Sequence, residues 1–233
     1  MRDLRDQIDG VWRAASRLTS ASGGRCVMFI SSREGEGTSS IAASFALLAA
    51  RKSQKSTWLL DLDLRRNAAF SSFEEGFARG VGKPGRAYDA SLRTEPIYSV
   101  SQPGTAGEAA KPSPKLLSVH EIENTRLLVS RFRTELLRKG QHVQLRSRPG
   151  WWEKVRQAAD WIVVDAPALT RSPAGLAFAA QADGVFIVVE ADSTGAEEVA
   201  SLRDEIISHG GKVAGLVLNR MGSDARFADR LAG

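Results

Sequence analysis

Apolar residues along the chain form short, nearly continuous runs that alternate with stretches of helical periodicity. The apolar runs lie at residues 26–30, 56–61, 125–130, 161–165, 182–192 and 212–219. Helical spacing is clearest at residues 41–50, 151–160 and 194–211. Apolar strands that alternate with helices are typical of a parallel sheet covered on its two sides. We therefore expect an α/β fold with a mostly parallel sheet and helices on both faces.

The first twenty residues carry a different pattern, in which apolar side chains recur every three or four positions. They are Leu4, Ile8, Val11, Trp12, Ala15 and Leu18. This spacing predicts an amphipathic helix of about five turns over residues 3–20, packed on the domain or on a neighbouring subunit. We assign residues 1–22 to this helix and residues 23–233 to one domain with an insertion. The chain is too short for two domains that each bury a large apolar core.

The periodic pattern is lost between residues 71 and 120. This stretch holds most of the prolines, many glycines, serines and alanines, and only short apolar runs. Such a composition buries too little apolar surface to order every residue. We therefore expect a long, irregular and partly mobile insertion at about residues 80–118.

Positive charge is concentrated in one segment of the chain. The formal net charge is +5, and residues 126–156 hold nine Lys and Arg side chains against two acidic ones. Such a segment suits an anionic membrane surface, an acidic partner or nucleic acid, and the alternative is a solvated basic face. No helix-turn-helix, zinc or aromatic RNA-binding pattern accompanies it, so nucleic acid is the least favoured partner.

The sequence lacks the signals of a secreted or membrane-spanning protein. No apolar run approaches the ~20 residues of a membrane span, and the first ten residues are charged, unlike a signal peptide. We therefore expect a cytoplasmic protein. The single cysteine, Cys26, lies in an apolar run and is best interpreted as a small core residue. The three histidines show no metal-ligand spacing.

Residues 29–40 read FISSREGEGTSS, the pattern of a phosphate-binding loop without its lysine. An apolar strand, a glycine-bearing turn and an alanine-rich helix follow one another as a P-loop requires. Backbone N–H groups and the helix N-terminus attract polyphosphate, but Thr38 stands where a working loop has Lys. The candidate binding residues are Gly35, Glu36, Gly37, Thr38, Ser39 and Ser40. Glycine and serine also cluster in ordinary strand-to-helix turns, so the loop alone leaves phosphate binding open.

Carboxylates follow two of the predicted strands. Asp61 and Asp63 follow the strand after the loop helix, and Asp165 ends the run at 161–165. Ligands of parallel sheets lie beyond the carboxyl ends of the strands, so we expect these side chains to share one site with the loop. Ser39 and Asp165 would hold Mg²⁺, and the other two aspartates would orient the attacking water or the accepting hydroxyl. The alternative for each carboxylate alone is a helix cap or a surface charge.

The order of these motifs resembles the deviant-Walker P-loop ATPases of the MinD and ParA type, and most of all their bacterial tyrosine kinase branch. The segments SSREGEGTSS, WLLDLDLRRN, DWIVVDAPA and GLVLNR carry the resemblance, which covers residues 25–70 and 155–220. It implies a P-loop NTPase-like fold, ATP or ADP with Mg²⁺ as ligands, and contact of Asn219 with adenine. It also implies a homo-oligomer that accompanies a membrane chain-length regulator in capsule or exopolysaccharide export.

The sequence also departs from the pattern of that branch. The replacements are Glu34 for a proline, Thr38 for the loop lysine, Asn67 for the proline that closes the second motif, and Ala166 for a threonine. A charge-assisted contact is worth ~1.5–3 kcal/mol, so losing the lysine would weaken nucleotide binding roughly 10- to 150-fold. Arg33 stands near the signature lysine of the MinD and ParA members, which reaches the phosphates of a partner subunit; the alternative is a solvent-exposed loop arginine. Residues 221–233 contain no tyrosine to accept a phosphoryl group.

Three functional hypotheses remain. The first is a degenerate kinase-like regulator of polysaccharide synthesis or export that docks on a membrane chain-length regulator, peripheral to the inner face of the cell membrane, with weak or no ATP turnover. The second is an active ATP-dependent protein tyrosine kinase or slow ATPase, which the retained aspartates favour. The third is a positioning ATPase of the MinD or ParA kind, favoured by the basic segment and disfavoured by the segment DLDLRRN. Whether the chain is an enzyme is left open, with the balance against catalysis.

Overall fold

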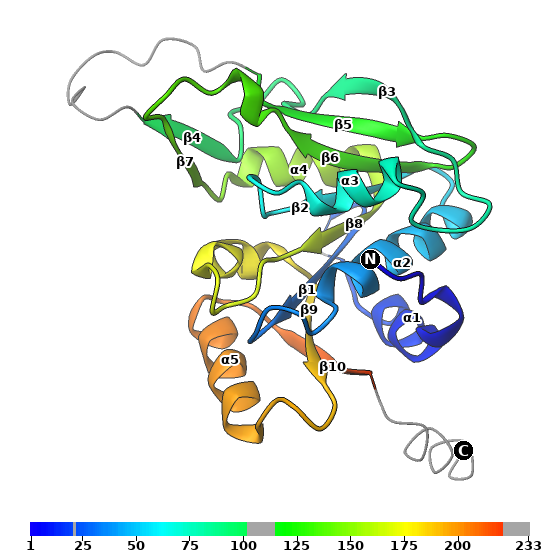
Figure 1. Cartoon of the computed structure of the whole chain (residues 1–233), viewed down its shortest axis with the longest axis vertical. Helices are drawn as coiled ribbons and strands as arrows, with labels where there is room; N and C mark the ends of the chain where they lie inside the picture. The colour runs from blue at the N-terminus through cyan, green and yellow to red at the C-terminus, as the bar shows by residue number, and fades with distance from the viewer. Residues whose placement is uncertain (21, 102–114, 221–233) are drawn as a thin grey trace.

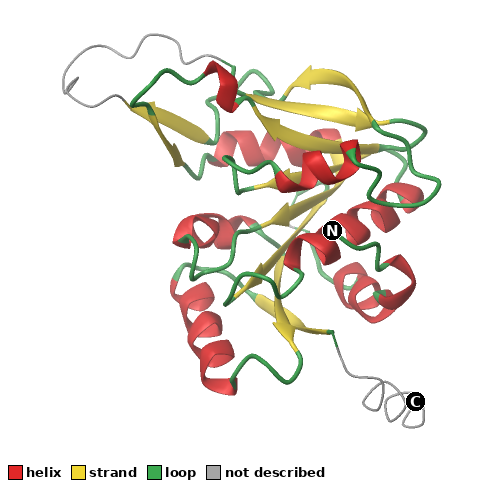
Figure 2. Ribbon diagram, viewed as in Figure 1, coloured by secondary structure: helices red, strands yellow, loops and turns green. Residues whose placement is uncertain are grey.

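The fold is built on an eight-stranded sheet (Figures 1 and 2), in a computed structural model that describes residues 1–20, 22–101 and 115–220. Six strands match the predicted apolar runs: β1 (Arg25–Ser31), β2 (Ser56–Asp61), β6 (Leu127–Phe132), β8 (Ala159–Asp165), β9 (Gly184–Glu190) and β10 (Val213–Asn219). They lie in the order β10-β9-β1-β8-β2-β6, and all neighbours are parallel. Two further strands, β5 (Leu117–Ile122) and β3 (Pro84–Asp89), extend the sheet antiparallel beyond β6. The expected mostly parallel α/β sheet is confirmed.

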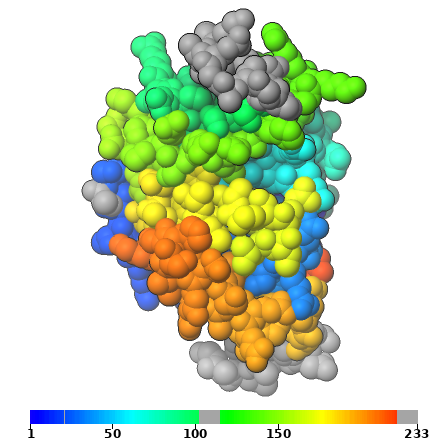
Figure 3. Space-filling view, turned by 90° about the vertical axis from the view of Figure 1, so that its left-hand side faces the viewer, coloured from blue at the N-terminus to red at the C-terminus, as the bar shows by residue number. Residues whose placement is uncertain are grey.

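Helices cover both faces of the sheet, and an apolar core lies under each layer. One face carries α1 (Asp9–Ser16), α2 (Thr38–Lys52) and α3 (Ala68–Glu74), and the other carries α4 (Pro149–Ala158), the 3-10 helix η3 (Pro173–Gln181) and α5 (Ala196–Ser208). Phe45 is fully buried in the first core and Trp151 in the second. The space-filling view shows η3 and α5, in yellow and orange, side by side on one surface (Figure 3). The sheet is therefore packed between two helical layers, with one apolar core on each of its faces.

The N-terminal segment is helical over a shorter range than its sequence predicts. A 3-10 turn, η1 (Arg5–Gln7), precedes α1, and α1 ends at Ser16. The prediction of one helix over 3–20 is therefore wrong in length. Packing against α2 sets the local conformation, because Leu4 and Ile8 are buried in the core that α2 also lines. The Leu4 N–H also donates to Ser44 Oγ of α2 at 2.8 Å.

The insertion predicted as irregular contains ordered β structure. Besides β3, residues of this stretch form β4 (Tyr98–Ser101), which pairs antiparallel with β7 (His142–Leu145) in a separate two-stranded sheet. The prediction is wrong here because β3 reads PGRAYD and is almost wholly exposed, so no apolar alternation marks it. A proline is tolerated there because β3 is an edge strand. Residues 102–114, where mobility was also expected, lie outside the described residues.

The basic segment folds into several elements rather than one. It comprises β6, the 3-10 helix η2 (Thr134–Leu136), β7 and α4. Arg126 precedes β6 and Arg133 follows it, so these two residues lie at opposite ends of the strand. Arg156 is nearly buried in an ion pair with Asp183, at 2.8 Å. The positive charge of the segment is thus distributed over the fold, and part of it is structural.

No helix among the described residues combines the length and the apolar character that crossing a bilayer requires.

Candidate functional site

The loop between β1 and α2 lies at the carboxyl end of β1, a central strand of the sheet. Gly35 and Gly37 adopt φ values of 92° and 91°, which side chains disfavour. A Cβ on Gly37 would also lie 2.1 Å from Nδ2 of Asn219. Helix α2 begins at Thr38, so the unpaired N–H groups of its first turn adjoin the loop. The strand, loop and helix thus occur in the predicted order, with a backbone shape suited to a phosphate group.

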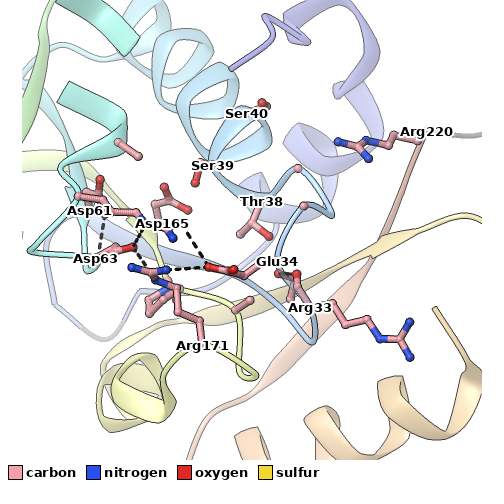
Figure 4. A pocket seen from close by; sticks show the side chains of 18 residues that line it. Arg33, Glu34, Thr38, Ser39, Ser40, Asp61, Asp63, Asp165, Arg171 and Arg220 are labelled. Atoms are coloured by element: carbon pink, nitrogen blue, oxygen red, sulfur yellow. Dashed lines mark hydrogen bonds and ion pairs between the residues drawn. The ribbon is translucent and has the colours of Figure 1, made fainter. Parts of the chain in front are cut away.

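A pocket of about 280 Å³ lies at these strand ends (Figure 4). Nine of the predicted site residues line it: Arg33, Gly35, Gly37, Thr38, Ser39, Ser40, Asp61, Asp63 and Asp165. Typical pockets for drug-sized ligands have volumes of ~300–1,000 Å³. The pocket is therefore sized for the polyphosphate end of a nucleotide rather than for the whole molecule.

Asp61, at the end of β2, is almost wholly buried and has a structural role. Its Oδ1 accepts the Asp63 N–H at 2.8 Å, and its Oδ2 accepts the Ala69 N–H at 3.0 Å, in the first turn of α3. Burial raises the pKa of this carboxyl to about 6, although the hydrogen bonds from the backbone oppose the shift. Asp61 thus fixes the turn between β2 and α3 as well as lining the pocket.

Asp165, at the end of β8, presents an unsatisfied oxygen to the pocket. Its side chain is 3% exposed, and its Oδ1 has no hydrogen-bond partner in the described part of the chain. Burial and then the charge of Asp61 raise its pKa well above the usual range, and the Ser39 hydroxyl opposes part of this shift. Thr38 Oγ1 is likewise buried without a partner among those residues. A buried polar atom left unpaired costs ~1–3 kcal/mol, so these oxygens mark a place for a ligand.

The hydroxyl and carboxylate pair fits the magnesium ion expected from the resemblance. Ser39 and Asp165 would hold it together with phosphate oxygens, because Mg²⁺ prefers oxygen ligands and commonly takes only one or two from carboxylates. Across residues 1–20, 22–101 and 115–220, no group of three or more His, Cys, Asp or Glu side chains is placed to bind a metal by itself. A metal here would therefore depend on the phosphates of its co-ligand.

Two arginines at the rim of the pocket are turned away from the aspartates. Arg33 is ion-paired with Glu198 of α5, and Arg220 is paired with Glu190 at 2.7 Å. Figure 4 shows both guanidinium groups on the far side of the loop from Asp165. Arg33 thus points away from the pocket of its own chain, and its expected contact with the phosphates of a partner subunit stays a prediction.

Two other arginines lie across the mouth of the pocket and share one carboxylate. Glu34 Oε1 accepts from Arg171 Nη1 at 2.8 Å and from Arg66 Nη1 at 3.3 Å. Arg171 Nε also lies 2.9 Å from Asp63 Oδ2. Figure 4 shows Arg171 between the two carboxylates that it joins. A carboxylate at this position would repel a phosphate, but the two arginines offset the charge of Glu34.

Glu36 and Asn219 hold the loop instead of lining the pocket. The Glu36 carboxylate is buried, and it accepts the N–H groups of Glu190 at 3.2 Å and Arg33 at 2.8 Å as well as the Thr194 hydroxyl. Asn219 Nδ2 donates to the Glu36 carbonyl at 2.8 Å. Both residues thus tie the loop to the ends of β9 and β10, and the expected contact of Asn219 with adenine stays a prediction.

Reasoning from the sequence missed the arginines that close the pocket. Arg66, Arg171 and Arg220 line it, yet none was assigned to the site. A signal existed for Arg171, because it is the only charged residue between Asp165 and Asp183. A lone charge in an otherwise apolar and small-residue stretch after a strand end indicates a residue of the site.

Comparison with known proteins agrees with the sequence motifs. No protein-family model matches the chain. The succinoglycan biosynthesis transport protein ExoP of Rhizobium meliloti (strain 1021) is 29% identical over 214 residues, which cover 89% of this chain and 24% of ExoP. The chain thus spans about a quarter of the length of that relative.

Solved structures of similar fold include kinase domains, two of them from proteins named as tyrosine kinases. The VpsO kinase domain matches with a TM-score of 0.59 and 18% identity, covering 94% of this chain and 95% of that one. The kinase domain of the Escherichia coli tyrosine kinase ETK matches with a TM-score of 0.58 and 14% identity, covering 94% and 78%. The BceF tyrosine kinase domain gives 0.56 and 16%, covering 92% and 75%. The chain therefore has the P-loop NTPase-like fold of these domains, and its motifs resemble the bacterial tyrosine kinase branch.

Proposed function

We propose that the chain is a degenerate kinase-like regulator of exopolysaccharide or capsule-type polysaccharide synthesis or export, with weak or no ATP turnover. The similarity to ExoP, whose name refers to succinoglycan biosynthesis and transport, supports the pathway class. The kinase-domain fold supports a nucleotide-type site at the carboxyl ends of the strands. The loss of the loop lysine supports the regulatory rather than the catalytic role.

One observation carries the proposal that turnover is weak. Among the residues that the structure describes, the four arginines lining the pocket are each ion-paired with a carboxylate of this same chain. Phosphoryl transfer depends on positive charge aimed at the equatorial oxygens of the transferred group. Thr38 contributes a hydroxyl where that charge is needed. The loop and the α2 N-terminus would still hold phosphate, and Ser39 with Asp165 would still orient the metal.

The expected partner is the cytoplasmic segment of a membrane chain-length regulator. This proposal rests on the resemblance to the tyrosine kinase branch, as do assembly into a homo-oligomer and a position at the inner face of the cell membrane. The exposed cations of the basic segment, among them Arg138, Lys139 and Arg146, suit an anionic surface of that kind. Nucleic acid remains the least favoured partner.

The alternative is an active kinase or slow ATPase, and it is favoured by the three aspartates that share the pocket. Calorimetric titration of the purified chain with ATP and ADP in the presence of Mg²⁺ separates the two proposals. For a degenerate site we expect binding no tighter than the millimolar range and a gain of affinity in Thr38→Lys, because the new ammonium would neutralise phosphate charge. Thr134→Lys adds the same charge on η2, away from the pocket, and should gain nothing.

Micromolar binding by the native chain that Asp165→Ala abolishes would contradict the proposal and favour the enzyme.

A genetic experiment tests the pathway role. If the regulator works without turnover, the native chain and the Asp165→Ala variant should restore the amount of polysaccharide equally well in a strain that lacks the gene. Loss of polysaccharide in the variant strain, at equal protein level, would show that the role requires ligand binding or catalysis at this site.

A further inference from the structure

Glu34 is held in the way that proteins hold a bound phosphate. One of its oxygens accepts from two different guanidinium groups, Arg171 at 2.8 Å and Arg66 at 3.3 Å. Convergence of arginines on one anionic group is the usual chemistry of phosphate recognition. Glu34 itself belongs to the phosphate-binding loop, where the resembled branch has a proline. The loop thus supplies an internal anion at the mouth of its own pocket.

Arg171 is fixed over the loop by the backbone that carries it. The segment after Asp165 hydrogen-bonds to the end of β1, with Leu169 N–H to Ser31 O at 2.9 Å and Thr170 N–H to Ser32 O at 3.0 Å. The Arg171 side chain is 27% exposed, and its guanidinium also contacts Asp63. Its position is therefore set by the same strand that sets the loop. A cation so placed faces the pocket from the side opposite to α2, whose first residue is Thr38.

The pocket also contains polar atoms that await a ligand. Asp165 Oδ1 and Thr38 Oγ1 are buried and unpaired in the described part of the chain, and both belong to residues that line the cavity. The cavity behind Glu34 thus has a carboxylate suited to a metal, the first turn of α2, and two arginines at its mouth. What these arginines lack is a free charge, because Glu34 and Asp63 occupy them.

We propose that Arg66 and Arg171 form a substitute phosphate clamp for the terminal phosphate of a nucleotide polyphosphate, and that Glu34 keeps this clamp closed as an internal competitor. A ligand enters when its phosphate displaces the Glu34 carboxylate from the two guanidinium groups. The inference rests on the proposed nucleotide-type pocket, and it adds the residues that replace the missing lysine and the residue that restrains them.

The test compares Glu34→Gln with the native chain by NMR titration, which measures dissociation constants into the millimolar range. The probes are ATP, inorganic pyrophosphate and AMP. Removing the competing charge should tighten binding of ATP and pyrophosphate by about tenfold or more, the range of a charge-assisted hydrogen bond, and leave AMP unchanged. Glu34→Ala is a second variant of the same kind. Glu153→Gln removes an exposed carboxylate of α4 and serves as the matched control.

Adding Arg171→Gln to Glu34→Gln should return the dissociation constant to the native value or weaker. Equal affinity of Glu34→Gln, Glu34→Ala and the native chain would overturn the proposed competition by Glu34. A double variant that binds as tightly as Glu34→Gln would overturn the clamp. Thermal melts check folding, which should be preserved in the Glu34 variants because the Glu34 side chain is more than half exposed. ATP turnover by the native chain would instead contradict the proposed function. The Glu34→Gln comparison would still decide whether Glu34 competes with phosphate for the two arginines.

Discussion

Single residues show how far charge in a sequence differs from charge at a surface. Arg156 belongs to the basic segment, yet its Nη1 donates to Asp183 Oδ2 at 2.8 Å and to Gly24 O at 2.7 Å, and its Nη2 donates to Gln181 O at 2.8 Å. Asp183 in turn accepts the Cys26 N–H at 2.7 Å. Counting charges along the chain could not reveal this, because Asp183 and Gly24 are distant in sequence. Cys26, in contrast, was placed correctly in the core from its apolar neighbours.

Replacing Arg156 should be costly because it strands a buried carboxylate. For Arg156→Met we expect a loss of about 3–5 kcal/mol in the free energy of unfolding, measured by urea denaturation, since Asp183 would be left uncompensated. Arg203→Met breaks an exposed pair with the adjacent Asp204 and should cost less than about 0.5 kcal/mol. Similar losses in the two variants would show that the buried pair has no special role.

The same neighbourhood makes Cys26 inert. Burial raises the pKa of its thiol to about 12, so almost no thiolate forms at neutral pH. We expect no reaction with an aromatic disulfide reagent in the folded protein and one thiol per chain in denaturant. Rapid labelling without denaturant would place Cys26 in a locally open segment instead.

Helices and strands were predictable where a run of apolar residues marks them in the sequence. They were not predictable where contacts with distant parts of the chain determine them. The six strands of the parallel sheet follow apolar runs, whereas β3 and β4 lie in polar sequence and form by pairing with β5 and β7. The start of α3 depends on Asn67, which has a left-handed conformation with φ of 48°. Its side chain donates to Phe132 O at 2.8 Å and accepts the Phe132 N–H at 2.6 Å. The departure from proline at this position thus has a structural reason.

Restoring the proline of the resembled pattern should damage this turn. Proline fixes φ near −65°, which is incompatible with the conformation of Asn67, and both hydrogen bonds to Phe132 would be lost. We expect Asn67→Pro to lower the free energy of unfolding by about 3 kcal/mol or more. Asn67→Gly tolerates the backbone angle and should lose only the hydrogen bonds, about 1–2 kcal/mol. Equal effects in chemical denaturation would show that the backbone angle is unimportant.

At the scale of the whole molecule, the fold places three carboxylates together and makes stability depend on pH. Burial raises the pKa of Asp61 to about 6 from 3.8 and that of Asp165 well above 3.8. The unfolded chain then loses these protons at lower pH than the folded chain does. Their contribution favours the folded state fully below about pH 3.8 and is lost as pH rises through the folded values. The position of this site was predictable from strand ends; the ion pairs that close it were not.

Asp165→Asn isolates the effect of pH. At pH 8 the variant should be more stable than the native chain by about 1–3 kcal/mol, because it removes a buried and unpaired charge. The difference should shrink toward pH 4, where the native carboxyl is protonated. Urea denaturation at pH 4, 6 and 8 measures this, with exposed Asp204→Asn as the control. A gap that is constant with pH would mean that Asp165 is not the group that titrates.

The two buried aspartates differ in what they can reveal about other chains of this kind. Asp61 positions backbone N–H groups at the start of α3, so selection for folding alone would retain it after chemistry is lost. Asp165 Oδ1 serves no such bond among the described residues. An aspartate at the position of Asp61 therefore says nothing about activity. An aspartate at the position of Asp165 indicates that selection still maintains ligand binding. In a lineage that has abandoned nucleotides, we expect the carboxylate of β8 to be replaced first.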